Sequence, residues 1–238
     1  MREFKDCYIA FIDILGFKEL LLSEEKNLCE KIARCFDEIE EKYFITVNST
    51  GKYLTEPYEI KQKVMSDSIC LYVDASVQNA LAGLIATCDY LQVRLLRQTS
   101  PILSRGAIVR GELFAENDIM FGKGFVSAYL MEEKTASNPR IIITNQVIKQ
   151  SDTLNDQGRD YIDKFTFVDE DGFITVDYIY LYYGLSRERD DWKRFAKHVY
   201  EKLDCEMDMS IRNKYLYLRK NIDRARAKFM KNKDYDNT

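Results

Sequence analysis

Apolar positions in the first hundred residues alternate between strand-like runs and helical stripes. The unbroken apolar run Tyr8–Ile12 is typical of a strand covered on both faces. Apolar residues recur at helical spacing from about Lys18 to Phe44 and again from about Ser76 to Gln98. Between these helices, Tyr58–Val64 and Ser68–Val73 predict a hairpin.

The next stretch continues the alternation. A long strand is predicted after Pro101, over residues 102–114, and a glycine-containing turn then leads into a helix that includes Glu132. A strand follows at Pro139–Thr144, and a hairpin pairs Phe165–Val168 with Phe173–Tyr180. The order of elements predicts an α+β fold, a ferredoxin-like sheet with helices packed on one face.

The pattern becomes wholly helical after about Leu185. We therefore divide the chain into a domain of residues 1–185 and a helical extension of residues 186–238 that packs on the domain or on a dimer. Residues 212–233 hold nine basic residues and one acid, Asp223. A nucleic-acid-facing or lipid-facing helix would have this charge, but apolar residues recur there at core spacing, which favours a packed helix with a solvated basic side.

Composition narrows the possible chemistry. With 35 Lys+Arg against 39 Asp+Glu, the net charge of −4 gives no overall attraction to nucleic acid or to an anionic membrane. The single histidine, His198, disfavours zinc sites and most histidine-based catalysis. Six scattered cysteines, no signal-peptide pattern and no apolar stretch near membrane-spanning length predict a cytoplasmic protein with reduced thiols. Carboxylates, Lys, Arg and metal ions must then supply any catalysis.

Two aspartates stand out against this background. Asp13 ends the apolar first strand, where a charge is costly unless it is paired or binds a metal. Asp67 lies at the tip of the next hairpin, between Ser66 and Ser68. In a ferredoxin-like sheet these strands are neighbours, and two converging carboxylates suit Mg²⁺ or Mn²⁺. Spacing alone leaves another interpretation open, in which Asp13 caps a helix and Asp67 is an ordinary turn residue.

The residues around both aspartates resemble a known family. The segment Phe11–Phe17 looks like the first metal motif of the class III nucleotidyl cyclases, Phe-x-Asp-Ile-x-Gly-Phe. Lys63–Asp67 is similar to their hairpin motif, Lys-x-x-Gly-Asp, with Ser66 in place of the glycine. The resemblance implies that Asp13, Asp67 and the backbone carbonyl of Ile14 bind two Mg²⁺ or Mn²⁺ ions. It also implies a homodimer, because such enzymes build each site from two subunits.

Later motifs depart from the ordinary purine cyclases. Those enzymes carry an Asn and an Arg on the helix that binds the transition state. Over residues 122–132, Val126 and Leu130 occupy the corresponding positions. The missing pair also leaves open a catalytically inactive, nucleotide-binding dimer, although the presence of both aspartates argues against it.

Other patterns in this region resemble the bacterial pyrimidine cyclases of Pycsar antiphage systems, which make cyclic UMP or cyclic CMP as an alarm signal for an effector. These patterns are Arg105-Gly106, Ala128-Tyr129-x-x-Glu132 and Pro139-Arg140-Ile141. The resemblance implies catalytic roles for Arg105, Arg140 and Tyr129, with the two arginines holding the triphosphate. Lys123 is a further candidate cation, and for each of the three cations a surface salt bridge remains an alternative interpretation.

The implied reaction is attack of the ribose 3′-oxygen on the α-phosphorus with departure of pyrophosphate, assisted by two metal ions. Lys63 and Asp118 lie at or near the positions where purine cyclases read the base, and a lysine donor suits a carbonyl oxygen of uracil or cytosine. Either residue is otherwise a solvated charge. UTP is preferred over CTP on the resemblance, and a purine cyclase with a divergent helix is the alternative. No nucleic acid or membrane partner is expected.

Overall fold

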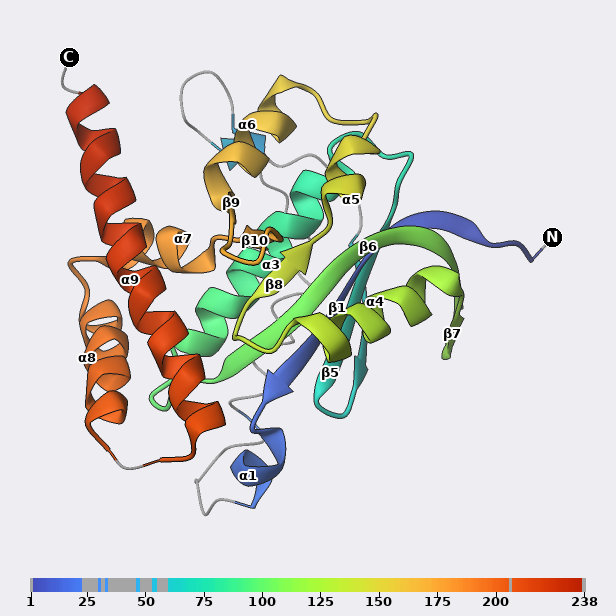
Figure 1. Ribbon diagram of the computed structural model, residues 1–238. Helices are drawn as coiled ribbons and strands as arrows, with labels where there is room; N and C mark the ends of the chain where they lie inside the picture. The colour runs from blue at the N-terminus through green and yellow to red at the C-terminus, as the bar shows by residue number, and fades with distance from the viewer. Residues whose placement is uncertain are drawn as a thin grey trace.

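The centre of the fold is a mixed eight-stranded sheet around β1 (Lys5–Leu15) (Figure 1). The strand order is β4-β5-β1-β6-β8-β10-β9, with β7 paired to β6. Neighbouring strands are antiparallel except for β6 and β8, which are parallel. The remaining strands are β4 (Lys61–Met65), β5 (Ser68–Asp74), β6 (Leu103–Glu116), β7 (Ile119–Phe121), β8 (Ile141–Ile143), β9 (Thr166–Val168) and β10 (Ile174–Val176).

The computed structural model describes residues 2–22, 30, 33, 46–47, 53–54, 60–205 and 207–236. Of the helix predicted from Lys18 to Phe44, the described part is α1 (Phe17–Leu21), and most of the rest lies outside the described residues. A separate short pair, β2 (Thr46–Val47) and β3 (Tyr53–Leu54), is also described. The first residues of the hairpin predicted from Tyr58 lie outside as well.

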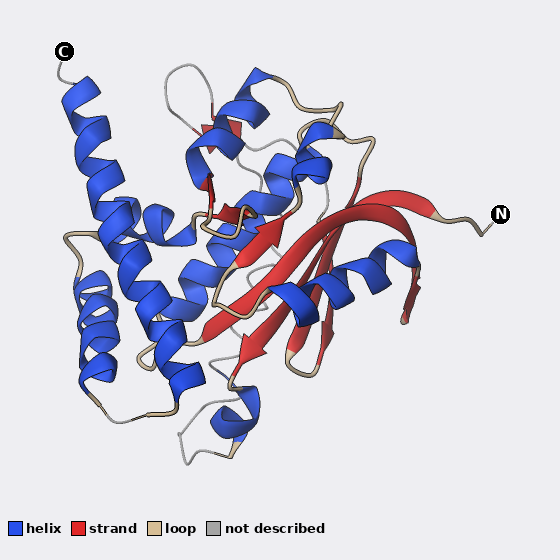
Figure 2. Cartoon of the chain, in the orientation of Figure 1, coloured by secondary structure: helices blue, strands red, loops and turns tan. Residues whose placement is uncertain are grey.

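Both faces of β1 are covered, which explains its unbroken apolar run. Tyr8, Ala10 and Ile12 join the main core with α3 (Ala80–Leu96). Ile9 and Phe11 point to the other face, where they pack with residues of α4 (Lys123–Thr135). Figure 2 shows this helix in front of the sheet. The predicted α+β sheet with helices is therefore confirmed, and α4 adds cover to the second face.

Helices follow one another after β10. They are α7 (Tyr178–Ser186), α8 (Asp190–Asp204) and α9 (Met209–Asp236), and the shorter α5 (Asn145–Lys149) and α6 (Asp156–Phe165) lie between β8 and β9. Side chains of α8 and α9, including Phe195 and Ile222, belong to the same buried core as α3. The predicted boundary at residue 185 falls in the last turn of α7, and the division into two units remains a prediction.

One predicted strand is shorter than expected. The strand predicted over Phe173–Tyr180 ends at Val176, and residues from Tyr178 onward form α7 instead. Asp177 causes the change, because its carboxylate accepts a hydrogen bond from the Tyr180 amide at 3.3 Å and so caps the helix. No helix in the described part of the chain is both long enough and apolar enough to span a bilayer.

Candidate functional site

The two predicted metal-binding aspartates lie at the same end of the sheet. Asp13 of β1 is opposite Ser68 of β5 on one side and Arg105 of β6 on the other. Asp67 belongs to the β4–β5 turn, and its carbonyl accepts a hydrogen bond from the Ile14 amide at 2.9 Å. This bond fixes the turn against the end of β1, and the Asp67 charge is near enough to act on the pKa of the Asp13 carboxyl.

The β4–β5 turn requires an unusual backbone conformation at Ser66. Its φ is +58°, in the left-handed region that glycine adopts more readily than other residues. The glycine of the motif that this hairpin resembles would adopt it with less strain. Serine therefore preserves the turn geometry, and with it the position of Asp67, at a cost in backbone strain.

Arg105 connects the aspartates to helix α4. Its Nε lies 3.3 Å from Asp13 Oδ2 and 2.6 Å from Glu132 Oε1. The Glu132 side chain is only 4% exposed, and its Oε1 makes no well-aligned hydrogen bond to any described group, so the contact is an ion pair of imperfect geometry. Arg105 thus sits between two carboxylates, and its expected role in holding the triphosphate stays a prediction.

Glu132 is the member of the site to which sequence reasoning gave no role. The residue formed part of the motif Ala128–Glu132 but was not singled out. The signal available was its place on α4, because residues 128 and 132 share one helix face, and Ala128 is buried against the sheet. A carboxylate on that buried face needs a cationic partner, and Arg105 supplies it.

The electrostatics of the cluster are dominated by negative charge. Burial raises the pKa of Glu132 to about 7, against the lowering effect of Arg105 and with a further contribution from Asp13. Burial likewise raises the pKa of Asp13, Arg105 opposes this, and the charge of Asp67 adds to it. Asp13 and Glu132 therefore share one arginine, and the pKa of each carboxyl is raised by burial and by the charge of Asp67.

The donor set fits a hard divalent cation. Asp13 and Asp67 offer carboxylate oxygens, and the Ile14 side chain is buried in the core, so only its backbone is available. No group of three or more His, Cys, Asp or Glu side chains suited to a metal occurs among the described residues. Two carboxylates without a closed cage suit Mg²⁺ or Mn²⁺, which complete their coordination with water and substrate phosphates.

Tyr129 lies on the same face of the sheet as this cluster. It is 42% exposed, and its ring meets that of Phe11 edge-on at 5.6 Å between centroids. Phe11 is two residues before Asp13 on β1 and therefore points to the same face. The predicted role of Tyr129 in shaping a pocket beside Asp13 is compatible with this position.

Lys123 is not brought to the cluster within one chain. It is the first residue of α4, nine residues before Glu132, which corresponds to about 13 Å along the helix. Its side chain is 91% exposed and lies 3.6 Å from Glu112. A role in holding the triphosphate at Asp13 and Asp67 of the same chain is therefore not supported.

Lys63 and Asp118, the two predicted base-reading residues, do meet. The Lys63 amine lies 3.5 Å from Asp118 Oδ1 and also donates a hydrogen bond to the Asn117 carbonyl. Lys63 is four residues before Asp67, about 13 Å along an extended strand, and Asp118 lies in the β6–β7 turn. The pair presents a donor beside an acceptor, away from the aspartates of its own chain.

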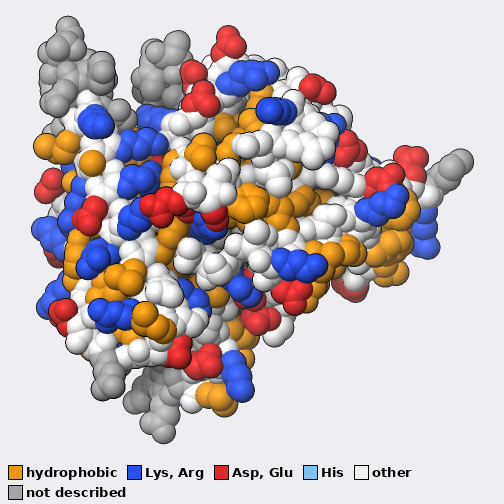
Figure 3. All heavy atoms as spheres, in the orientation of Figure 1, with side chains coloured by type: hydrophobic (Ala, Val, Ile, Leu, Met, Phe, Trp, Pro, Cys, Tyr) orange, Lys and Arg blue, Asp and Glu red, His pale blue; other side chains and the backbone are white. Residues whose placement is uncertain are grey.

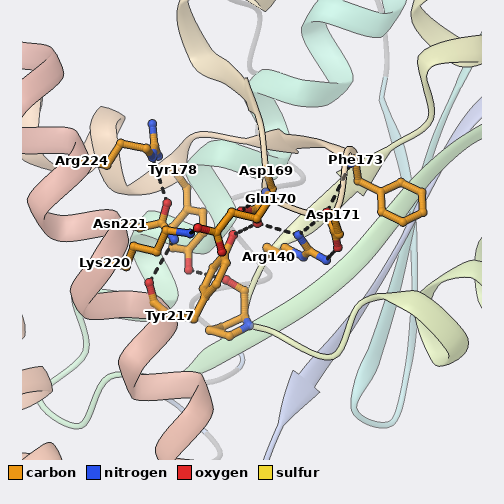
Figure 4. Close-up of polar contacts among 11 residues, drawn as sticks. Arg140, Asp169, Glu170, Asp171, Phe173, Tyr178, Tyr217, Lys220, Asn221 and Arg224 are labelled. Atoms are coloured by element: carbon orange, nitrogen blue, oxygen red, sulfur yellow. Dashed lines mark hydrogen bonds and ion pairs between the residues drawn. The ribbon is translucent and has the colours of Figure 1, made fainter.

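The structure corrects the expectation for Arg140. Its side chain is only 3% exposed, and it donates hydrogen bonds to Asp169 at 2.5 Å and to Asp171 (Figure 4). The residue lies just before β8 and shares the face of Arg105, but its guanidinium is neutralised by two carboxylates. Arg105 is also paired with two carboxylates, but its side chain is 26% exposed; a guanidinium that is doubly paired and almost fully buried, as in Arg140, is not free to hold a triphosphate.

Comparisons with known proteins give likenesses among solved structures. The chain is similar to the adenylyl cyclase CyaB from P. aeruginosa, at 16% identity over 74% of this chain and 94% of that one, with a TM-score of 0.43. It is similar to the guanylyl cyclase domain of the RhoGC fusion protein from Blastocladiella emersonii, at 14% identity over 74% and 96%, with a TM-score of 0.45. A class III adenylyl cyclase-like ATP-binding protein from Pseudomonas aeruginosa gives 8% identity over 72% and 38%, with a TM-score of 0.42.

No protein-family model matches the chain, and no curated protein sequence matches it. The residues of the chain itself therefore carry the functional assignment.

Proposed function

We propose that this chain is a nucleotidyl cyclase that converts a nucleoside triphosphate, UTP in preference to CTP, into the 3′,5′-cyclic monophosphate and pyrophosphate. One observation carries the proposal: Asp13, Asp67, Arg105 and Glu132, from four separate elements, converge at one end of the sheet. A carboxylate pair beside an arginine is what transfer of a phosphoryl group between oxygens requires.

Asp13 and Asp67 would hold the divalent cations in this proposal. When bound, Mg²⁺ or Mn²⁺ supplies Lewis acidity toward the ribose 3′-hydroxyl and the triphosphate. Arg105 lies beside Asp13 and offers positive charge where it develops on the equatorial oxygens of the α-phosphorus. The 3′-oxygen forms its bond to the α-phosphorus, the bond to the β-phosphate oxygen breaks, and the hydroxyl proton passes to solvent.

Glu132 has a distinct task in the same scheme. Its carboxylate faces the Arg105 Nε at 2.6 Å, and its pKa of about 7 places its titration in the physiological range. The ionised form offsets the charge of Arg105 together with Asp13, whereas the protonated form leaves more of that charge to act on the substrate. Glu132 thereby sets how much of the Arg105 charge acts on the substrate.

The pair of Lys63 and Asp118 supports base recognition. A lysine donor beside a carboxylate acceptor matches a uracil carbonyl and its N3–H, and also cytosine N3 and its amino group. Adenine presents a similar edge, which keeps a purine cyclase as the second candidate. The pyrimidine preference rests on the motifs around Arg105, Tyr129 and Arg140 in the sequence, and so does the proposed role of the product as an antiphage alarm signal read by an effector protein.

A homodimer follows from the distance between the two halves of the site. The aspartates and the Lys63–Asp118 pair lie apart in one chain, so a site needs both from different subunits. Exposed apolar residues of α4 and β7, shown as hydrophobic surface in Figure 3, supply a face for a second copy. The exposed fractions are 51% for Val126, 37% for Leu130 and 49% for Phe121.

The test is to incubate the purified protein with Mn²⁺ and each of ATP, GTP, CTP and UTP in separate reactions, and to identify products by mass spectrometry. We expect cyclic UMP as the main product, with cyclic CMP second, and none of either in the presence of EDTA. Cyclic AMP or cyclic GMP as the main product would favour the purine cyclase instead. Absence of every cyclic product, with retained binding of a triphosphate, would identify an inactive nucleotide-binding dimer.

A further inference from the structure

A buried polar cluster ties the C-terminal helix α9 to the sheet (Figure 4). Arg140 donates to Asp169 Oδ2 at 2.5 Å, and Tyr217 of α9 donates its hydroxyl to the same oxygen at 2.9 Å. The Arg140 guanidinium also lies 5.8 Å from the centre of the Tyr217 ring, and Asp171 accepts a further bond from it. The cluster therefore joins three segments: the residue before β8, the β9–β10 turn and α9.

Two further contacts support the cluster, one from α7 and one from α9. The Tyr178 hydroxyl, at the start of α7, donates to the carbonyl of Pro139 at 2.5 Å. Lys220 of α9 lies 2.6 Å from Glu170, the residue between Asp169 and Asp171 in the sequence of the β9–β10 turn. Residues 139 and 140 are thus fixed through both their backbone and the Arg140 side chain.

The segment held in this way adjoins the candidate catalytic residues. The amide of Gly106, directly after Arg105, donates to the Arg140 carbonyl at 2.9 Å. On the other side Gly106 packs against β1 so closely that an added Cβ would lie 2.6 Å from the Phe11 carbonyl oxygen. Gly106 is hydrogen-bonded to residue 140 on one side and tightly packed against β1 on the other. A displacement of residue 140 would therefore move the backbone of Arg105 relative to β1 and Asp13.

We propose that α9 positions Arg105 through the cluster of Arg140, Asp169 and Tyr217, with Arg140 as a positioning residue and not a substrate contact. The inference rests on the proposed function only for the catalytic task of Arg105. Apolar side chains of α9 such as Leu218 and Ile222 are fully buried and pack α9 against the core. The polar cluster adds what apolar packing lacks, a directional link in which loss of one partner leaves a buried charge unpaired.

The protonation states of Tyr217 and Asp171 in this cluster do not change around neutral pH. Burial is the main cause that raises the pKa of Tyr217, so its hydroxyl keeps the proton that it donates to Asp169. The hydrogen bond from Arg140 lowers the pKa of Asp171, so that carboxylate stays ionised. The cluster is therefore a fixed support whose disruption requires a substitution or the departure of α9.

The chain offers a matched pair of variants for the test. Tyr217→Phe removes the hydroxyl given to Asp169 and keeps the ring against Arg140. Tyr215→Phe, two residues earlier on α9, removes a hydroxyl that lies 3.4 Å from His198 Nε2 of α8, outside the cluster. Hydrogen–deuterium exchange of the segment that includes Gly106 is measured for both, together with kcat and KM for UTP in the presence of Mn²⁺.

For Tyr217→Phe we expect faster exchange at Gly106 and a loss of about tenfold in kcat with KM nearly unchanged, as for other supporting groups behind a catalytic residue. Tyr215→Phe should resemble wild type in both. Unchanged exchange and unchanged kcat in Tyr217→Phe would overturn the proposal. If exchange responds as expected while wild type makes no cyclic nucleotide, the coupling stands and the proposed function fails.

A second comparison decides the matter if Tyr217→Phe folds poorly. Arg140→Lys keeps the charge near Asp169 and loses the two-pronged guanidinium, whereas Arg140→Met loses both. A positioning role predicts that Lys restores part of the kcat that Met loses, at equal global stability of the two variants. Equal kcat in the two variants and in wild type would contradict the role of Arg140.

Discussion

At the residue scale, the proposed site depends on a single arginine between two carboxylates. Arg105 lies on β6 within ion-pair distance of both Asp13 and Glu132. The sequence indicated this residue through its position before Gly106 and could not show Glu132 as its partner, because α4 and β6 meet only in the folded chain. Its two partners differ in kind, since Asp13 belongs to the proposed metal site and Glu132 does not.

The first prediction concerns Arg105. Arg105→Ala should lower kcat for cyclisation of UTP by about 10²–10³, because it removes positive charge that acts on the transition state. Arg110→Ala is the matched control, since Arg110 lies on the same strand, has a 25% exposed side chain against 26% for Arg105, and pairs with Asp6. Steady-state kinetics of the two variants decide the point, and similar losses in both would assign Arg105 to general strand stability.

The second prediction concerns the titration of Glu132. Its carboxyl has a pKa of about 7 in the folded chain against an ordinary value of 4.5. Between these values the folded state holds a proton that the unfolded state has lost, so the contribution of Glu132 to the free energy of unfolding falls as pH rises from about 4.5 to about 7. Glu132→Gln should remove this slope in metal-free urea unfolding, whereas Glu133→Gln, at the exposed neighbouring position, should keep it. Retention of the slope in Glu132→Gln would contradict the assignment.

At the element scale, the strands and helices that an apolar pattern can specify were predicted, and each error comes from a contact that the pattern does not show. The run Tyr8–Ile12 indicated a covered strand because both of its faces are apolar. The strand expected to reach Tyr180 ends at Val176, because a buried apolar run does not distinguish strand from helix, and the cap at Asp177 decides for helix. The sequence suggested that Arg140 holds the triphosphate because it could not show the partners of this residue. Asp169 and Asp171 lie about thirty residues away, on a hairpin turn.

The third prediction tests the turn that carries Asp67. Because Ser66 has φ of +58°, Ser66→Gly should leave stability unchanged or slightly raised. Ser66→Val should lower the free energy of unfolding by about 1–2 kcal/mol, since a β-branched residue is strained in the left-handed region. Urea unfolding of both variants measures the difference. Equal stability of the valine and serine proteins would show that the turn adopts another conformation.

At the scale of the whole molecule, the helical C-terminal segment is packed into the same core as the sheet. Helices α8 and α9 join the main core, and basic residues of α9 are used inside the molecule: Arg224 and Lys228 bind the buried Asp177 at 2.8 and 3.1 Å. Sequence pattern favoured a packed helix over a nucleic-acid-binding one, and these contacts show what some of its charges do. The pattern could not indicate which carboxylates they meet.

The fourth prediction tests the shared site of the proposed homodimer. Asp13→Ala and Lys63→Ala proteins should each be inactive, because each removes one half of every site. An equal mixture with free exchange of subunits should recover about a quarter of wild-type activity, since half of the dimers are mixed and each has one intact site in a two-fold assembly. Activity of the mixture no higher than that of its parts, with exchange verified by labelled subunits, would place both halves of the site in one chain.

In the proposed function, Asp13 and Asp67 together support cyclisation of a nucleoside triphosphate. The most direct measurement compares cyclic UMP formation by wild type, Asp13→Asn and Asp67→Asn with that of Asp74→Asn, a substitution at the opposite end of β5. We expect loss of product in the first two variants with retained folding, and near-normal turnover in the third. Substantial product from either Asp13→Asn or Asp67→Asn would contradict the proposed function.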